Sequence, residues 1–119
     1  MRVAVVCWGS GSSGSLRPVA QSIAAGLQVQ GHQVTEIVPP SDKVRLTVFQ
    51  YVVLVTEASN VLGSRLAPGL GEWLSGSGLR PGTRGAVFVR NRLIGAYRSL
   101  RLAMAAMEKE GCYLTYNDI

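Results

Sequence analysis

The sequence contains few of the side chains from which catalytic and metal sites are usually built. Its 119 residues include one histidine and two cysteines, and only 16% of the residues are charged. The single histidine, His32, falls in a predicted turn and cannot serve a catalytic triad on its own, and the cysteines lie too far apart for metal-ligand spacing. No carboxylate pair is evident. We therefore expect no catalytic residue and no metal site, so that any chemistry would belong to a bound cofactor.

Disulfide bonding and membrane insertion are also not expected. Cys7 ends a predicted central strand and Cys112 begins a predicted edge strand. Neighbouring strands are about 4.8 Å apart and these two are not neighbours, so both cysteines are predicted to be reduced packing residues. No apolar run approaches the roughly 18 residues of a membrane span. The first residues read as a strand rather than a signal peptide, so we expect a cytoplasmic protein.

The composition is that of a globular domain. Apolar residues make up 47% of the chain, which favours a packed core and argues against disorder. A length of 119 residues suits one core. We predict a single domain over residues 1–119.

Positive charge is concentrated in the second half of the chain. The formal net charge is +5, and six arginines but no acidic residue occur between Arg80 and Arg101. Such a bias favours an anionic partner, which could be a phosphorylated cofactor, nucleic acid or an acidic protein. An arginine-rich solvated surface explains the same pattern.

Strand and helix patterns alternate along the chain. Residues 3–7 and 51–55 are apolar at every position, as in parallel strands buried on both faces. Residues 34–38, 86–89 and 112–116 are the other predicted strands. Helices are predicted over about 15–30, about 66–74 and from after Gly95 to about Glu110, while residues 42–48 fit either a short extended piece or a frayed helix. This alternation predicts a parallel, doubly wound sheet, with ligands at the carboxyl ends of its strands.

The stretch from Gly9 to Ser15 predicts a phosphate site. It is a loop of glycine and serine between the first strand and the first helix, where backbone N–H groups, the helix dipole and hydroxyl groups converge. The loop also matches the dinucleotide pattern G-x-G-x-x-G, with Glu36 near the position of the ribose-binding acid. The short chain, the many serines and the long helix argue against that alternative. Another nucleotide or phosphate ligand also remains open.

At this loop the sequence resembles the flavodoxin-like superfamily, particularly its NADPH-dependent FMN reductase and quinone reductase branch. The loop, Arg17 and Gly31-His32 follow the family pattern within about one residue. The segment TEASNVLGSRLAP from Thr56 to Pro68 is similar to the family's second loop. The resemblance covers almost the whole chain. It implies a three-layer α/β sandwich with a five-stranded parallel sheet in the order 2-1-3-4-5.

The resemblance also implies a cofactor, FMN, with NAD(P)H as a possible electron donor. The loop after the first strand would hold the phosphate, and residues after the third and fourth strands would border the ring. The cofactor-binding residues so predicted are Trp8, Gly9, Ser10, Gly11, Ser12, Ser13, Gly14, Ser15, Thr56, Ser59, Asn60, Arg90 and Asn91.

Three departures from the family pattern are visible. Val61-Leu62 stands where members usually offer an aromatic residue to the ring, and Trp8 is either its replacement or a partly buried lid over the sheet edge. The loop after the fourth strand is basic, Arg90-Asn91-Arg92, rather than rich in glycine. The sequence also ends at Ile119, where the family continues into a last helix. We therefore expect a short form with an apolar sheet face left bare, and a homo-oligomer formed through that face.

Two functions follow from these observations. The first is an FMN-binding redox protein, either an electron carrier or a small NAD(P)H-dependent flavin or quinone reductase. Its partners would be a redox protein or a small-molecule acceptor, without membrane or nucleic acid. If it is an enzyme, it is an FMN-dependent oxidoreductase. The alternative is a cofactor-free, flavodoxin-like interaction module that binds a protein or a polyanion.

Overall fold

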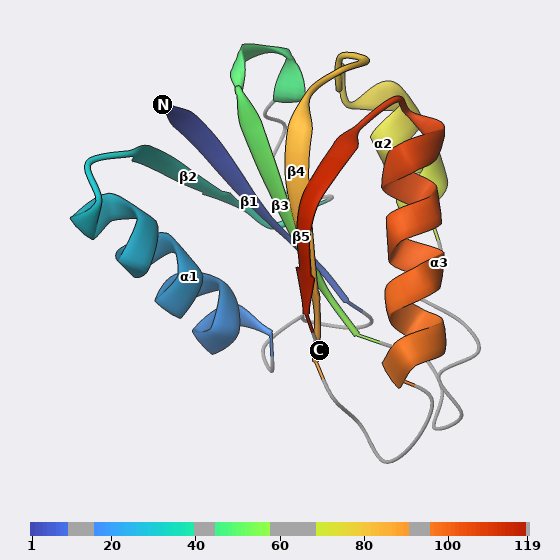
Figure 1. The fold of residues 1–119 in the computed structure, drawn as a ribbon, viewed down its shortest axis with the longest axis horizontal. Helices are drawn as coiled ribbons and strands as arrows, with labels where there is room; N and C mark the ends of the chain where they lie inside the picture. The colour runs from blue at the N-terminus through green and yellow to red at the C-terminus, as the bar shows by residue number, and fades with distance from the viewer. Residues whose placement is uncertain (10–15, 40–44, 58–68, 91–95, 119) are drawn as a thin grey trace.

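A five-stranded parallel sheet forms the middle layer of the structure (Figure 1). The computed structural model describes residues 1–9, 16–39, 45–57, 69–90 and 96–118. The strands are β1 (Arg2–Trp8), β2 (Gln33–Ile37), β3 (Tyr51–Thr56), β4 (Arg84–Val89) and β5 (Tyr113–Asp118). Their order is β2-β1-β3-β4-β5 and every adjacent pair is parallel. The predicted topology is confirmed.

Helices cover both faces of the sheet. α1 (Arg17–Val29) lies on one face, and α2 (Leu70–Gly76) and α3 (Ala96–Lys109) lie on the other (Figure 1). Pro18 occupies the first turn of α1, where its missing N–H is not needed. Gly31 and Gly111 follow α1 and α3 with φ of +91° and +83°, a conformation that glycine adopts without strain.

Two apolar cores result from the alternation of side chains along the strands. On the α1 side, Val3, Val5 and Val53 pack with Ala20 and Ala24 of the helix. Ala20 and Ala24 are small, so α1 lies close to the sheet. On the other side, the larger core includes Val52, Leu54 and Val87 of the sheet, together with Leu74 of α2 and Leu100, Ala103 and Met107 of α3.

The structure changes or completes the sequence-based prediction at three places. The helix predicted over residues 66–74 begins only at Leu70, because the φ of +93° at Gly69 places that residue outside α2; residues 66–68 lie outside the described part of the chain. The ambiguous segment before β3 contains a short 3₁₀ helix, η1 (Leu46–Val48), and Leu46 is buried. Thr56, expected in a loop, is the last residue of β3.

The ladder between β4 and β5 contains one irregularity. Gly85 pairs with Leu114 and Ala86 pairs with Tyr116, so Thr115 is an extra residue on the outer strand. Thr115 Oγ1 donates to the Gly85 carbonyl at 3.3 Å and shares a hydrogen bond of 2.6 Å with the Tyr51 hydroxyl of β3. These contacts hold the β-bulge in place.

Both cysteines are buried and free, as predicted. None of the helices in the described part of the chain is long and apolar enough to cross a membrane. The described residues also contain no group of three or more side chains suited to holding a metal ion.

Candidate functional site

The candidate site lies at the edge where β1, β3 and β4 end. Because the strands are parallel and in register, Trp8 pairs with Thr56 and Thr56 pairs with Val89. The next residues, Gly9, Glu57 and Arg90, therefore leave the sheet at the same edge, which we call the carboxyl edge. Segments 10–15, 58–68 and 91–95 follow these residues in sequence.

Four of the predicted cofactor-binding residues come together at the carboxyl edge, namely Trp8, Gly9, Thr56 and Arg90. The others lie outside the described residues: Ser10, Gly11, Ser12, Ser13, Gly14, Ser15, Ser59, Asn60 and Asn91. Their roles stay predictions.

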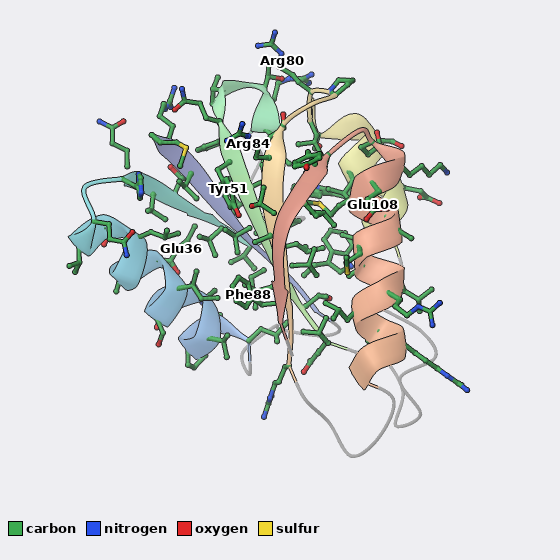
Figure 2. All side chains as sticks on the ribbon, viewed as in Figure 1. Glu36, Tyr51, Arg80, Arg84, Phe88 and Glu108 are labelled. Carbon is green, nitrogen blue, oxygen red and sulfur yellow. The ribbon has the colours of Figure 1, made fainter. Side chains whose placement is uncertain are left out.

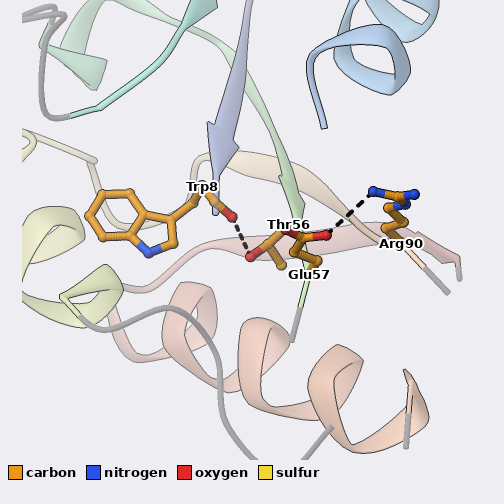
Figure 3. A network of polar contacts seen from close by, with 4 residues as sticks. All are labelled: Trp8, Thr56, Glu57 and Arg90. Atoms are coloured by element: carbon orange, nitrogen blue, oxygen red, sulfur yellow. Dashed lines mark hydrogen bonds and ion pairs between the residues drawn. The ribbon is translucent and has the colours of Figure 1, made fainter. Parts of the chain in front are cut away.

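Hydrogen bonds connect the three strand ends. The hydroxyl of Thr56 donates to the carbonyl oxygen of Trp8 at 2.6 Å (Figure 3). The backbone N–H of Arg90 donates to the carbonyl oxygen of Thr56 at 2.9 Å. Thr56 is fully buried, so its hydroxyl cannot bond to water and needs a hydrogen-bond partner within the protein. These two hydrogen bonds hold the ends of β1, β3 and β4 together at the carboxyl edge.

Glu57 is a site residue that the sequence analysis missed. Its side chain is only 4% exposed, and its Oε2 lies 3.7 Å from Nη1 of Arg90, whose side chain is 44% exposed (Figure 3). Burial of a carboxylate is unfavourable unless charge or hydrogen bonds compensate. The available signal was its position: Glu57 is the first charged residue after an apolar strand, at a predicted ligand-binding edge.

Trp8 packs into the core rather than standing clear of the sheet. It is 9% exposed, and its ring centroid lies 5.7 Å from that of Trp73 in α2, with the two rings tilted by 39°. Gly69, just before α2, is close enough that a Cβ there would lie 3.4 Å from the Trp8 ring. The tryptophan pair therefore anchors α2 to the end of β1.

The start of α1 favours an anion. Its first turn contains no acidic residue, and no described side chain caps the N-terminal N–H groups. Arg17, the first residue of the helix, adds a positive charge. Unsatisfied N–H groups and the helix dipole attract negative charge to such an end.

Cys7 lies one residue before Trp8, close to the carboxyl edge, and the pKa of its thiol depends on the charged groups there. Burial raises the pKa of the Cys7 thiol, Arg17 opposes this, and the negative charges of Glu57 and Glu36 add to it. Glu36 and Arg17 also line a cavity of about 130 Å³ between α1 and β2. The described residues thus place one cation and two carboxylates around the end of β1.

Comparison with known proteins identifies the fold. No protein-family model matches the chain, and no curated protein matches its sequence. Oxidised flavodoxin 1 from Bacillus cereus superposes with a TM-score of 0.75 at 12% identity, covering 100% of this chain and 84% of that one. An archaeal flavodoxin gives 0.72 at 14% identity, with 99% and 82% covered. Two-electron reduced Megasphaera elsdenii flavodoxin gives 0.71 at 16%, with 98% and 84% covered. The chain has the flavodoxin-like fold.

Proposed function

We propose that the protein binds FMN at the carboxyl edge and acts in electron transfer. The observation that carries the proposal is the junction of β1 and α1. There a segment rich in glycine and serine leads into a helix whose first turn has Arg17 and no acid. A phosphate monoester is the ligand that such a junction favours. The flavodoxin-like fold supports the choice of FMN, because the solved structures that this chain resembles are flavodoxins in oxidised and reduced states.

The residues present fit the phosphate end of FMN. The N-terminal N–H groups of α1 would be the donors, Arg17 would add charge, and the serines between Gly9 and Ser15 would add hydroxyl groups. When bound, FMN would supply the redox chemistry. The protein would orient the phosphate through these donors, with no acidic residue in the first turn of α1.

The other side of the proposed site holds a buried carboxylate. Glu57 and Arg90 would border the ring, and their ion pair holds the strand ends of β3 and β4 together. A negative charge near a flavin disfavours addition of an electron because like charges repel. Glu57 would therefore tune how readily the bound cofactor is reduced.

Titration with FMN tests the proposal. We expect the purified protein to bind FMN and to perturb its absorbance. Changing Ser10, Ser12 and Ser15 together to Ala should weaken binding by about 100-fold, because charge-assisted hydrogen bonds to the phosphate would be lost. The matched control is Ser75→Ala, an exposed serine on α2, which should bind FMN like the wild type.

A second pair of variants isolates the charge at α1. Arg17→Ala should weaken FMN binding several-fold and reduce its dependence on salt. Arg98→Ala removes an exposed arginine from the first turn of α3, on the opposite face, and should leave binding unchanged. The proposal is wrong if the wild type does not bind FMN at millimolar concentration. It is also wrong if the variant with Ser10, Ser12 and Ser15 changed to Ala binds FMN as tightly as the wild type.

One observation favours the alternative, a cofactor-free interaction module. Trp8, which could have supplied an aromatic face to the ring, is buried against Trp73, and Arg90 is directed to Glu57. On this alternative the exposed arginines of α3 would bind an acidic protein or polyanion. A colourless protein that is retained on immobilised heparin and released earlier after Arg98→Glu would support it.

A further inference from the structure

One surface of the sheet is rich in aromatic side chains and lies beside α1. α1 lies over β2 and β1, and among the described residues no helix covers the same face over β3, β4 and β5 (Figure 1). Tyr51 and Phe88 project on this face, as Figure 2 shows. Tyr113 of β5 is 68% exposed, and the exposed Arg84 of β4, which pairs with both Tyr51 and Tyr113, lies between them on the same face. We call this surface the aromatic strip.

A hollow separates the aromatic strip from α1. It measures about 180 Å³, and its lining is apolar, with Ile23 and Leu27 on the helix side and Tyr51 and Phe88 on the strip side. Val53 and Ala86 form its floor and are almost fully buried. An engineered cavity of about 150 Å³ accepts benzene, so this hollow has room for a large apolar side chain.

The outer surface of α1 is also unusual for a helix in contact with water. Of its nine exposed residues, only Arg17 is charged. One of the uncharged residues, Val29, is apolar and 88% exposed. On α3, four of the six exposed residues from Arg98 onward are charged, namely Arg98, Arg101, Glu108 and Lys109. The exposed side of α1 thus carries far fewer charges than that of α3. A surface with few charges loses little when another molecule covers it, so the α1 side is the one suited to an interface.

The small residues of α1 are placed for close packing against another helix. Ser22 and Gly26 are four residues apart and therefore lie on one side of the helix. Ile23, next to Ser22, points to the hollow, and a Cβ on Gly26 would meet no atom within 4 Å. The side of α1 that faces the aromatic strip can thus accept a neighbouring backbone.

We propose that a second copy of this chain covers the aromatic strip and that its α1 is the covering helix. Each copy would present both surfaces, α1 and the strip, side by side. A two-fold axis running between two parallel α1 helices therefore places each helix on the strip of the other copy. Such an isologous arrangement closes after two copies. The inference does not depend on FMN binding.

The size of the surface suits this occupant. A helix of 13 residues is about 20 Å long, and three strands are about 14 Å across, so helix and strip together measure roughly 400 Å² in projection. The relief of the side chains adds to the accessible area. The smallest specific interfaces bury about 600 Å² of accessible surface per partner, and the relief of the side chains raises the accessible area of this surface toward that value.

Sedimentation velocity between 1 and 100 µM tests the proposal on the full chain. The wild type should sediment as a dimer of twice the 12.7 kDa chain mass. Ala25→Glu places a charge on the exposed side of α1 and should weaken association at least 100-fold. Ala105→Glu makes the same change at an exposed position of α3 and should leave the dimer intact.

Two further variants keep the test decisive if Ala25→Glu folds poorly. Val29→Lys changes a side chain that is 88% exposed at the end of α1, and it should also give a monomer with an unchanged circular dichroism spectrum. Ser22→Cys should form a disulfide-linked dimer on mild oxidation, whereas Ala105→Cys should not. A wild type that is monomeric at 100 µM, or a dimer that Ala25→Glu and Val29→Lys leave intact, would overturn the proposal.

Discussion

Gly85 in β4 is a residue at which the packing leaves no room for a side chain. A Cβ at this position would lie 2.7 Å from the carbonyl oxygen of Val52 and 2.9 Å from Sγ of Cys112. Neither atom can move freely, because Val52 belongs to a central strand and Cys112 is buried. A side chain here would have to push β3 and β4 apart.

Gly85→Ala should therefore lower the free energy of unfolding by about 2–4 kcal/mol, as overpacking against fixed backbone does. Gly71→Ala in α2 is the control, since a Cβ there meets no atom within 4 Å. Alanine favours a helix, so that variant should be neutral or more stable by up to about 1 kcal/mol. Urea unfolding of the two variants measures the difference, and equal midpoints would contradict the packing described.

Cys112 makes stability depend on pH in the alkaline range. Burial, with a smaller contribution from Glu108, raises the pKa of its thiol from 9.0 to about 11. Below pH 9 the thiol is neutral in both the folded and the unfolded chain. Between pH 9 and 11 only the unfolded chain loses the proton, so stability falls, and above about pH 11 the loss is complete.

We expect the free energy of unfolding to fall by on the order of 2 kcal/mol between pH 9 and 11 because of this thiol. Tyrosine and lysine also titrate there, so the measurement is the difference between wild type and Cys112→Ala at each pH. That difference should shrink as the pH rises through this window. A difference that stays constant would show that the thiol has an ordinary pKa in the folded protein.

At the scale of secondary structure, β1 and β3 are the best protected elements. Each is hydrogen-bonded on both sides, and nearly every residue in them is buried. β2 pairs only with β1, and most of its residues are exposed or half-buried. Local stability therefore decreases from the middle of the sheet toward β2.

Hydrogen exchange should reproduce this gradient. The amides of β1 and β3 are expected to exchange only through global unfolding, and those of β2 at least about 100-fold faster through local opening. Exchange followed by mass spectrometry on peptides from residues 2–8, 33–37 and 51–56 measures both rates. Equal protection of β2 and β3 would contradict the expectation.

The sequence predicted best those elements whose pattern of apolar residues fits only one kind of secondary structure. Uninterrupted apolar runs identified β1 and β3, and the predicted ends of α1 and α3, near residues 30 and 110, lie within one residue of the observed ends. α2 was misplaced because its short length gives little periodicity, and Gly69 takes a positive φ that no sequence pattern announced. Thr56 belonged to β3 because its hydroxyl finds a partner in Trp8, a contact between residues 48 positions apart.

The site was predicted less completely than the fold. Register brings Trp8, Thr56 and Arg90 together, and parallel strands made that foreseeable. A partly buried Trp8 was one of the two interpretations of the sequence, but its partner Trp73 was not foreseeable, because that contact depends on where α2 begins. Glu57 was missed because a single carboxylate carries no motif, and its burial with Arg90 appears only in three dimensions.

For the whole molecule, the two proposed surfaces use different parts of the fold and share only α1. The carboxyl edge includes the start of α1 at Arg17 and the ends of β1, β3 and β4. The hollow beside the aromatic strip is lined by Met1, Val3 and Tyr51 near the opposite ends of β1 and β3, and by Phe88 near the end of β4. α3, which carries the exposed Arg98 and Arg101, lies on the other side of the sheet (Figure 1). A failure of FMN binding would therefore leave the dimer standing, and the reverse is also true.

The β-bulge at Thr115 has a consequence for how molecules of this protein meet in concentrated solution. β5 is an outer strand, and an outer strand with regular spacing is a template onto which a strand from another molecule can add. The extra residue breaks that spacing, and its bonds to Gly85 and Tyr51 keep it from relaxing. Sheets of two molecules therefore cannot easily join edge to edge through β5.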